Sequence, residues 1–403
     1  MKILFAFFLL FFIASPSLCS QLVNHKILLD GSNHFNVLNY GAKGDGQTDD
    51  SNAFLRAWQD VCSTRQSNPI LLIPNGKRFL LQPVSFRGPC KSSRVNVVLQ
   101  GTISAPKSIE EWDWTKGDVG KSWIQFWHIN GLVINGGGTV DGQGAPWWNK
   151  FHDQTDLTRP TALRFSNCDN LNVATLTHIN SPKNHISITS CHGVRISHLH
   201  INAPEESPNT DGFDISSSSN ILIYRSTIST GDDCIAINSG SNFINITDVY
   251  CGPGHGISVG SLGKGGDFAM VEEILVKNCT FRGTTNGARI KTWVGGRGYA
   301  RKITFEDIKL YKVSHPVIID QQYDALLSST NDAVKISDVT YRKIRGTSND
   351  NDAIELNCAS IGCTNIVFEN IYIIGVDRET TSSSCRNVEG TSSYCNPKIP
   401  CLS

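Results

Sequence analysis

The chain has 403 residues, and 39% of them are hydrophobic, which is enough to bury a large core. Lysine plus arginine and aspartate plus glutamate number 36 each, so the formal net charge is zero. A protein without a global positive field does not attract polyanions nonspecifically. We therefore expect no nucleic acid partner, and any acidic ligand must be held by a local cluster of cations.

The first twenty residues have the composition of an export signal. Lys2 precedes an apolar run over 3–14, and small residues dominate 15–20. A membrane anchor is the weaker alternative, because about 20 apolar residues are needed to span a bilayer and no later stretch is long enough. We expect a signal peptide at 1–20 and a soluble, secreted mature protein with one domain over 21–403 and no membrane partner.

Residues 48–61 form a predicted helix outside the pattern of the rest of the chain. Residues 48–51 offer side chains that could cap its N-terminus. Its apolar residues share one helical face: Ala53, Phe54, Ala57, Trp58 and Val61. We expect this helix to cover the open N-terminal end of a β-structure, whose exposed strands would otherwise pair with other chains.

Six tryptophans follow between 112 and 148. They could form a platform on which sugars stack, or they could simply pack, and we favour packing for most of them. They are Trp112, Trp114, Trp123, Trp127, Trp147 and Trp148.

An eight-residue pattern with apolar residues at positions 1, 3, 6 and 8 recurs through the chain. Copies begin at Leu171, Val194, Ile221, Ile244, Ile274, Ile303, Val334 and Ile366. Alternation on both sides of a polar pair at positions 4 and 5 is typical of two short strands joined by a tight bend. The region lacks a helix-length 3.6-residue period, which excludes helical repeats. The sequence predicts an all-β, right-handed, single-stranded parallel β-helix whose coils stack about 4.8 Å apart.

Thirteen cysteines, one of them within the predicted signal, suggest disulfides in an exported chain. Their spacing favours the pairs Cys62–Cys90, Cys234–Cys251, Cys358–Cys363 and Cys385–Cys395, the last within a Cys-containing tail over about 377–403. Cys168 and Cys191 each precede a repeat by three residues, so they should lie on adjacent coils, either bonded or merely stacked. Cys279 occupies an inward position, and we expect it to be a buried free thiol.

Two sequons for N-glycosylation lie inside the repeats. They are Asn245-Ile246-Thr247 and Asn278-Cys279-Thr280, so Asn245 and Asn278 could each accept a glycan.

Four polar signatures punctuate the apolar strands at intervals of about one coil. They are Asn209-Thr210-Asp211, Gly231-Asp232-Asp233, Gly254-His255-Gly256 and Arg289-Ile290-Lys291. Each would be an ordinary turn or an outward pair of cations if it stood alone. All four fall between one two-strand unit and the next, so we expect their side chains to gather on one side of the stack. Like charges are costly to place together, so three aspartates on one face argue for a function.

The chemistry of such a cluster suits the hydrolysis of a glycosidic bond. One carboxyl group must hold a proton for the leaving oxygen, and close carboxylates raise the pKa of a neighbour. Another must be ionised to activate a water. The cations would bind an anionic sugar, because arginine grips a carboxylate with two parallel hydrogen bonds. Coil spacing does not choose between a retaining and an inverting mechanism.

These signatures resemble those of the polygalacturonases, the family 28 glycoside hydrolases, and of their plant branch in particular. The matching segments are SPNTDG at 207–212, GDDCIAI at 231–237, GPGHGISVGSLG at 252–263 and RIKTW at 289–293. The resemblance extends over nearly the whole mature chain, from NYGAKGDGQTDDSNAF at 39–54 through IDQQYD at 319–324 to the region of Cys358 and Cys363.

The resemblance implies a secreted enzyme that hydrolyses α-1,4-linked galacturonan in demethylated pectin of the plant cell wall, with inversion and without a cofactor or metal. It assigns each role to a matching position: Asp232 as general acid, Asp211 with Asp233 to activate water, His255 to tune the acid, Arg289 and Lys291 to hold the substrate carboxylate, Asn209 to support the Asp211 turn, and Tyr323 to contact substrate. Asp324 stands where many plant relatives have cysteine, a departure that affects one disulfide and no catalytic position.

Other functions are compatible with parts of the sequence. A pectate lyase of β-helical fold would need a calcium site of clustered carboxylates and would leave an unsaturated product. A non-catalytic, wall-binding solenoid is disfavoured because every catalytic position is intact. Within the polygalacturonases we favour endo over exo attack only slightly, and we expect a monomer.

Overall fold

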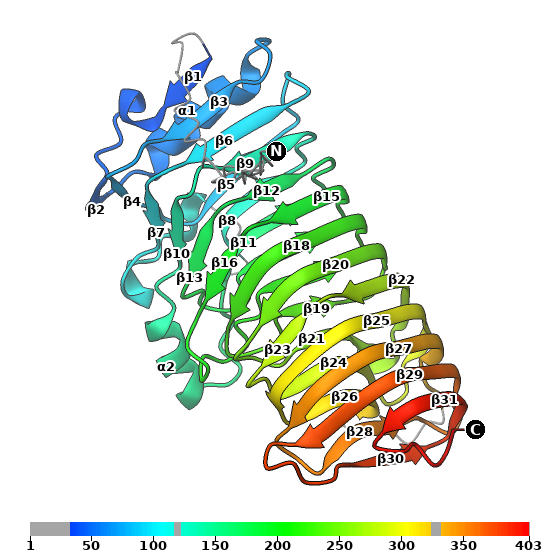
Figure 1. Ribbon diagram of the computed structural model, residues 1–403. Coiled ribbons are helices and arrows are strands. Elements are labelled where there is room, and N and C mark those ends of the chain that lie inside the picture. The colour runs from blue at the N-terminus through cyan, green and yellow to red at the C-terminus, as the bar shows by residue number, and fades with distance from the viewer. Residues whose placement is uncertain (1–32, 117–121, 324–331, 403) are drawn as a thin grey trace, which may run out of the picture. The chain divides into compact units, whose positions relative to one another are not determined.

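The computed structural model describes residues 33–116, 122–323 and 332–402. The predicted signal peptide at 1–20, and Asp324, lie outside the described residues. Asn33–Ser403 form one compact unit in which strands far apart in sequence stack in parallel (Figure 1). Within the described residues this is the predicted right-handed parallel β-helix, in which each coil buries its apolar side chains only by stacking on the next.

One side of the coils is a sheet of eleven strands. In stacking order it consists of β5 (Val84–Arg87), β8 (Ser122–Trp127), β11 (Thr161–Ser166), β14 (Ile186–Thr189), β17 (Phe213–Ser216), β19 (Ile235–Ile237), β21 (Ile257–Leu262), β24 (Asn286–Trp293), β26 (His315–Tyr323), β28 (Asp352–Asn357) and β30 (Ser382–Arg386). We call it the eleven-stranded sheet.

The remaining sides belong to a sheet of 20 strands that begins as two columns. One column contains β1 (His34–Asn36), β3 (Ile70–Ile73), β6 (Val95–Leu99), β9 (Leu132–Asn135), β12 (Asn172–Ala174) and β15 (His192–Ser197); the other contains β2 (Asp45–Asp49), β4 (Arg78–Leu80), β7 (Thr102–Ser104), β10 (Thr139–Asp141), β13 (Thr177–Ile179) and β16 (His200–Asn202). The columns merge in longer strands that bend around the corner between them: β18 (Ser219–Ser229), β20 (Ser241–Cys251), β22 (Phe268–Lys277) with β23 (Thr280–Arg282), β25 (Arg297–Val313), β27 (Lys335–Ser348), β29 (Cys363–Gly375) and β31 (Val388–Asn396).

The tight bend predicted within each repeat is a residue in the left-handed conformation. At position 5 of every repeat φ lies between 50° and 56°, which turns the chain within one residue. These residues are Thr175, His198, Arg225, Asp248, Asn278, Asp307, Lys343 and Asn370.

One repeat begins five residues later than the sequence pattern indicated. Ile303 pairs with Val339, and Val339 pairs with Ile366, so the seventh repeat starts at Val339 and the predicted start at Val334 is wrong. Val334 and Ile336 are also buried apolar residues at alternate positions. They lie in the same strand region as Val339, on the other side of a corner. Local alternation cannot choose between two such frames, and pairing with the neighbouring coils does.

Inward side chains form ladders that run from coil to coil. Phe305, Tyr341 and Phe368 stack with centroid distances of 5.5 and 4.7 Å, and all are fully buried. The helix α1 (Ser51–Ser63) packs its apolar face on the N-terminal coils, where Phe54 meets Phe79 at 5.3 Å. It lies at that end of the stack in Figure 1, as predicted for a cap.

The polar start of α1 differs from the predicted capping. Asp50 is the N-cap residue but makes no capping bond; its carboxylate accepts hydrogen bonds from the backbone N–H groups of Lys43 and Gly44. A second helix, α2 (Ala145–Asp153), lies beside the coils, and four single-turn 3₁₀ helices complete the described helical structure: Val37–Tyr40, Ile109–Glu111, Trp114–Lys116 and Lys264–Gly266.

Three of the four predicted disulfides are confirmed, namely Cys62–Cys90, Cys234–Cys251 and Cys358–Cys363. The predicted pair Cys385–Cys395 is wrong, because Cys385 bonds to Cys401. Cys385 lies on β30 and Cys395 on β31, in different sheets, whereas the C-terminal turn returns beside β30. Cys168 and Cys191 are stacked rather than bonded, and Cys279 is the buried free thiol that was expected.

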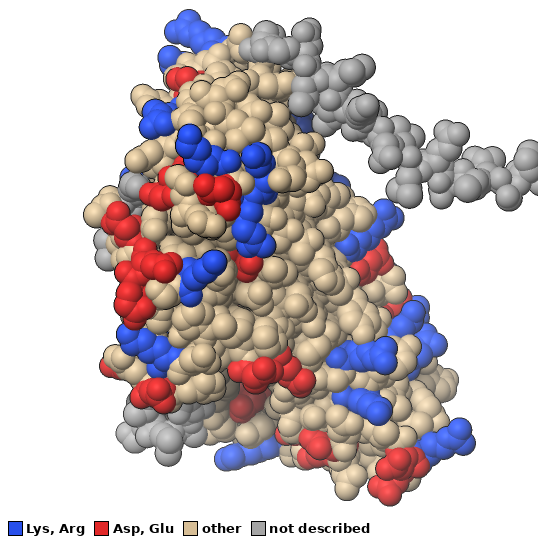
Figure 2. Space-filling view, turned by 90° about the vertical axis from the view of Figure 1, so that its left-hand side faces the viewer, with Lys and Arg blue, Asp and Glu red and all other residues tan. Residues whose placement is uncertain are grey.

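Most of the tryptophans pack, as predicted. Trp112, Trp123, Trp147 and Trp148 are buried, whereas Trp127 is 37% exposed. No helix within the described residues is long and apolar enough to cross a membrane. Figure 2 shows acidic and basic side chains interspersed on one face, consistent with the balanced composition.

Candidate active site

The predicted site residues come together on the outer side of the eleven-stranded sheet. Asp211 lies in the turn before β17, Asp232 and Asp233 lie before β19, and His255 lies before β21. Arg289 and Lys291 project from β24, and Tyr323 ends β26. Consecutive coils therefore present the four signatures one above another.

Asp233 is held by two cations and a hydroxyl group. Its carboxylate lies 2.6 Å from the Arg289 guanidinium and 2.7 Å from Lys291 Nζ, and it accepts a 2.8 Å hydrogen bond from Ser258. The Asp233 side chain is 1% exposed, so these groups compensate its buried charge. Asp233 alone neutralises only one of these two positive charges, and Lys291 also acts on Asp232 and Asp211, whose pKa values it lowers.

Asp232 accepts hydrogen bonds on both carboxylate oxygens. Oδ1 lies 2.9 Å from His255 Nδ1 and accepts the Asp233 backbone N–H, and Oδ2 accepts the Asn209 amide at 3.2 Å. Burial by itself raises the pKa of Asp232, but the hydrogen bond and charge of His255, together with Lys291, outweigh burial and lower it. A carboxyl group in this setting is a strong acid that seldom keeps its own proton.

Asp211 has the opposite electrostatic setting. Burial and the neighbouring charges of Asp214, Asp232 and Asp233 raise the pKa of Asp211 well above its usual range, and Lys291 offsets only part of this effect. The carboxyl groups titrate together, so a proton bound by the cluster resides preferentially on Asp211. Two carboxyls with pKa values pushed apart are typical of acid–base pairs in catalytic sites.

Arg159, which was not found from the sequence, supports this arrangement from two coils before Asp211. Its guanidinium donates to the carbonyls of Pro182 and Pro208 and, at 2.6 Å, to Asn209 Oδ1. Because Oδ1 is the acceptor, the Asn209 amide nitrogen must face Asp232. Arg159 is 5% exposed, and burial lowers its pKa to about 10, against the opposing charges of Asp211 and Asp232.

Asp214 is a further carboxyl group that sequence patterns did not single out. It points outward from β17 and accepts hydrogen bonds from the side-chain amides of Asn184 and Asn238. Burial raises its pKa to about 6. The alternation of 213–216 buries Phe213 and Ile215 and turns Asp214 outward, and its place directly after the Asn209-Thr210-Asp211 signature is the signal that could have found it.

An aromatic group closes the C-terminal side of the cluster. Lys291 Nζ lies 5.5 Å from the Tyr323 ring, and Trp293 meets Tyr323 edge-on at 5.4 Å. Lys264 Nζ lies 4.8 Å from the Trp293 ring. These contacts place Tyr323 beside the cations, where a sugar bound by them would lie against aromatic surface.

Glycine is required where turns pass close to the neighbouring coil. A Cβ on Gly231 would lie 2.0 Å from the Ser207 carbonyl oxygen. Gly256 has a φ of 82°, and a Cβ there would lie 2.2 Å from the Asn286 carbonyl oxygen. The glycines of two signatures thus allow the aspartates and the histidine to approach one another.

The donor set offers one place for a cation, but it does not suit a divalent metal. Ligand atoms of Asp232, Asp233 and His255 lie within 4.8 Å of one another. Asp233, however, already bonds to Arg289 and Lys291, and these charges repel another cation.

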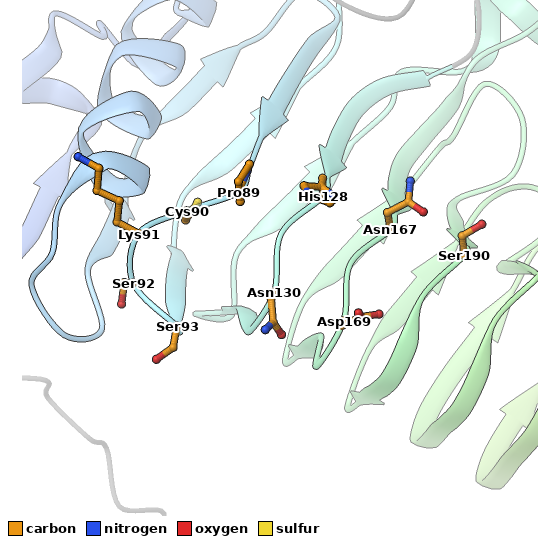
Figure 3. A pocket seen from close by; sticks show the side chains of 10 residues that line it. All are labelled: Pro89, Cys90, Lys91, Ser92, Ser93, His128, Asn130, Asn167, Asp169 and Ser190. Carbon is orange, nitrogen blue, oxygen red and sulfur yellow. The ribbon is translucent and has the colours of Figure 1, made fainter.

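A separate hollow of about 450 Å³ lies along the turns after β5, β8 and β11 (Figure 3). Its side chains include a single carboxylate, Asp169, together with Lys91 and His128. A lone carboxylate cannot supply both an acid and a base, so we place the candidate active site at the Asp232 cluster.

Comparison with known proteins identifies the family. The profile of Glycosyl hydrolases family 28 matches residues 62–395. A protein of Arabidopsis thaliana named "Probable polygalacturonase" is 47% identical over 93% of this chain and 82% of its own length, and a polygalacturonase of Persea americana is 43% identical over 87% and 76%. The chain therefore belongs to glycosyl hydrolases family 28 and is a glycoside hydrolase.

The fold agrees with solved structures. An endo-xylogalacturonan hydrolase from Aspergillus tubingensis superimposes with a TM-score of 0.77 and 24% identity, covering 88% of this chain and 98% of that one. At this identity the similarity concerns the fold, which is the β-helix described above.

Proposed function

We propose that this chain is a secreted polygalacturonase that hydrolyses α-1,4-galacturonosidic bonds of demethylated pectin with inversion, as a monomer in the plant cell wall. The observation that carries the proposal is the pair of cations, Arg289 and Lys291, at the carboxyl cluster, of which Asp233 by itself neutralises only one. A uronate carboxylate of the substrate would balance the other positive charge beside the acid–base pair. The names of the Arabidopsis and Persea relatives support the same activity.

The resemblance to the family's motifs assigns the roles, and the hydrogen bonds of the site are compatible with them. Asp232 donates a proton to the glycosidic oxygen, so it must hold that proton in the productive complex, although its lowered pKa leaves it ionised in the free enzyme. His255 tunes the acid through the 2.9 Å contact between its Nδ1 and Asp232 Oδ1. Asp211, with Asp233, activates the attacking water: Asp211 must be ionised when the water attacks, so the proton of the cluster lies on Asp232 at that moment, and the raised pKa of Asp211 then favours its uptake of the proton that the water loses.

Activity on polygalacturonate tests the proposal. The purified protein should release reducing ends, and Asp232→Asn should lower kcat by at least about 100-fold. Asp169→Asn, which alters the carboxylate of the other hollow, is the matched control and should leave kcat unchanged. Full activity of Asp232→Asn would exclude this mechanism.

Product analysis separates the finer possibilities. An inverting enzyme releases the β-anomer first from an α-linkage, which proton NMR detects before mutarotation. Long oligomers early in the reaction indicate endo attack, which we favour, and monomer indicates exo attack. An unsaturated product that requires calcium would identify a lyase, and binding without release of reducing ends would identify a non-catalytic solenoid.

A further inference from the structure

Phe243 occupies a corner of the coil where an exposed aromatic residue is out of place. It precedes a repeat, has a φ of 52°, and its side chain is 56% exposed. The residues before all seven other repeats have the same left-handed conformation but are polar or glycine: Asn170, Gly193, Asn220, Glu273, Lys302, Asp338 and Asn365. Asparagine and glycine tolerate positive φ, whereas a bulky aromatic residue there is unfavourable and gains no burial from the fold.

A shallow groove of about 740 Å³ lies beside Phe243 on the outside of the twenty-stranded sheet. Leu222 and Leu275 lie along it on the neighbouring strands β18 and β22, and Asn245 of β20 lies between them in the ladder. Phe243 and the two leucines give the groove an apolar strip beside Asn245, and its lining also includes Asn220, Thr304 and the charged side chains of Arg195, Glu273 and Lys302. It belongs to a different face from the carboxylate cluster, because Asp232 and Asp233 precede strands of the eleven-stranded sheet.

Asn245 is the first residue of the sequon Asn245-Ile246-Thr247, and both polar side chains point outward. Among the described residues, nothing forms a hydrogen bond with the Asn245 side chain. The other sequon differs, because the Asn278 amide donates a 2.5 Å hydrogen bond to Asp248 and Asn278 itself forms a corner at φ 51°. Among the described residues, Asn245 is thus the sequon asparagine whose amide is unused and which lies beside an exposed aromatic ring.

We propose that Asn245 is a glycosylation site and that the first N-acetylglucosamine lies in this groove against Phe243. The amide nitrogen of Asn245 forms a bond to C1 of the sugar, loses one proton, and displaces the pyrophosphate of a polyprenyl-linked oligosaccharide, which is the co-reactant. A pyranose ring has a face of C–H groups that packs on aromatic and aliphatic surface. The glycan covers the exposed ring of Phe243 and the partly buried side chains of Leu222 and Leu275.

Peptide mapping tests the modification. The full chain is secreted from a plant cell culture and treated with peptide N-glycosidase in heavy-oxygen water, which converts a glycosylated asparagine to labelled aspartate. Label at residue 245 is the expected result, and Asn278→Gln is the matched control that should leave it in place. Secreted protein that carries no label at residue 245, with or without label at 278, overturns the proposal.

Thermal unfolding of four proteins tests the contact with Phe243. Phe243→Asn introduces the residue found at the equivalent corners Asn170, Asn220 and Asn365, so it should raise the Tm of the aglycosyl variant Asn245→Gln. In the glycosylated protein Phe243→Asn also removes the surface under the sugar. The Tm change that it causes there should be lower, by about 2 °C or more, than the Tm change that it causes in the aglycosyl variant. Equal shifts in both backgrounds would show that sugar and ring do not interact.

Sedimentation of the aglycosyl variant addresses the other possible occupant of the groove. It should remain monomeric at concentrations where the glycosylated protein is monomeric. A dimer that Phe243→Asn dissociates, together with an unmodified Asn245, would assign the groove to a second copy of the chain.

Discussion

Acid should weaken this fold through one pair of buried histidines, His178 and His185. Their Nδ1 atoms lie 2.9 Å apart, and neither ring is more than 1% exposed. Burial lowers the pKa of His178 to about 3, and burial together with the charge of His178 lowers the pKa of His185 well below its usual range. One shared proton satisfies the two facing nitrogens while both rings are neutral, and the Nε2 atoms have no partner among the described residues.

The sign follows from where protons bind. The unfolded chain protonates both histidines below about pH 6.5, whereas the folded chain keeps them neutral, so their contribution to stability is complete above that pH and is lost as the pH falls. Each fully protonated histidine of the unfolded chain costs about 1.4 kcal/mol per pH unit, and both are half protonated at about pH 6.5, so the pair should lower the free energy of unfolding by about 3 kcal/mol between pH 6.5 and 5. Asp211 and Asp214 have the opposite effect on the free energy of unfolding. Because folding raises their pKa values, they favour the folded chain as the pH falls.

Comparing the pH dependence of the free energy of unfolding between variants therefore separates the contribution of the histidines from that of the aspartates. His178 stacks between Val140 and Ile201, so His178→Ile extends an aliphatic ladder, and combined with His185→Leu it removes both titrating groups. The free energy of unfolding, measured by denaturant titration from about pH 7.5 to 5, should depend less steeply on pH in this double variant. His200→Gln, an exposed histidine on β16, should keep the wild-type slope. An unchanged slope in the double variant, or titration of His178 near pH 6.5 by NMR, would refute the reasoning.

Three further predictions concern the active site. Arg159→Ala removes the bonds that orient Asn209, so the acidic limb of the pH–rate profile should move and kcat should fall about 10- to 100-fold. Arg159→Lys should recover part of this activity. A lower Tm with an unchanged pH–rate profile would argue for a purely structural role. Lys291→Met removes one of the two cations, so kcat/KM on polygalacturonate should fall about 10- to 100-fold, and steady-state kinetics that match wild type would contradict substrate binding there. Replacing Cys234 and Cys251 by alanine opens a loop of 17 residues that begins directly after Asp233, which should cost about 3 kcal/mol of stability by thermal unfolding; an unaltered Tm would show that the coils alone hold this turn.

Much of the fold was predictable because its information is local and repeated. Alternating apolar residues on both sides of a polar pair can bury one face only if coils stack, and eight copies leave little room for another architecture. The error at Val334 arose where two overlapping frames alternate equally well, and only pairing with Ile303 and Ile366 distinguishes them. The error at Cys385 has the same origin, since short separation along the chain does not ensure the same sheet.

The candidate site was predictable in composition but not in its contacts. The four signatures named the aspartates, the histidine and the cations because their residue types and spacing are unusual. Arg159 carries no such signal, since a single arginine before a strand is unremarkable until its three acceptors are seen. Asp214 was likewise only one outward residue of a strand.

The sequence by itself determined that this chain coils into a parallel β-helix and that its ionisable signatures fall on one side of the coils, because strand alternation and coil-length spacing are properties of the chain alone. Only the tertiary structure decided that Arg289 and Lys291 both pair with Asp233, that Asp211 has the raised pKa, and that Asn245 lies beside an exposed Phe243. These outcomes depend on the directions of side chains, on the lengths of the connecting turns and on burial, which arise only when one coil lies against another.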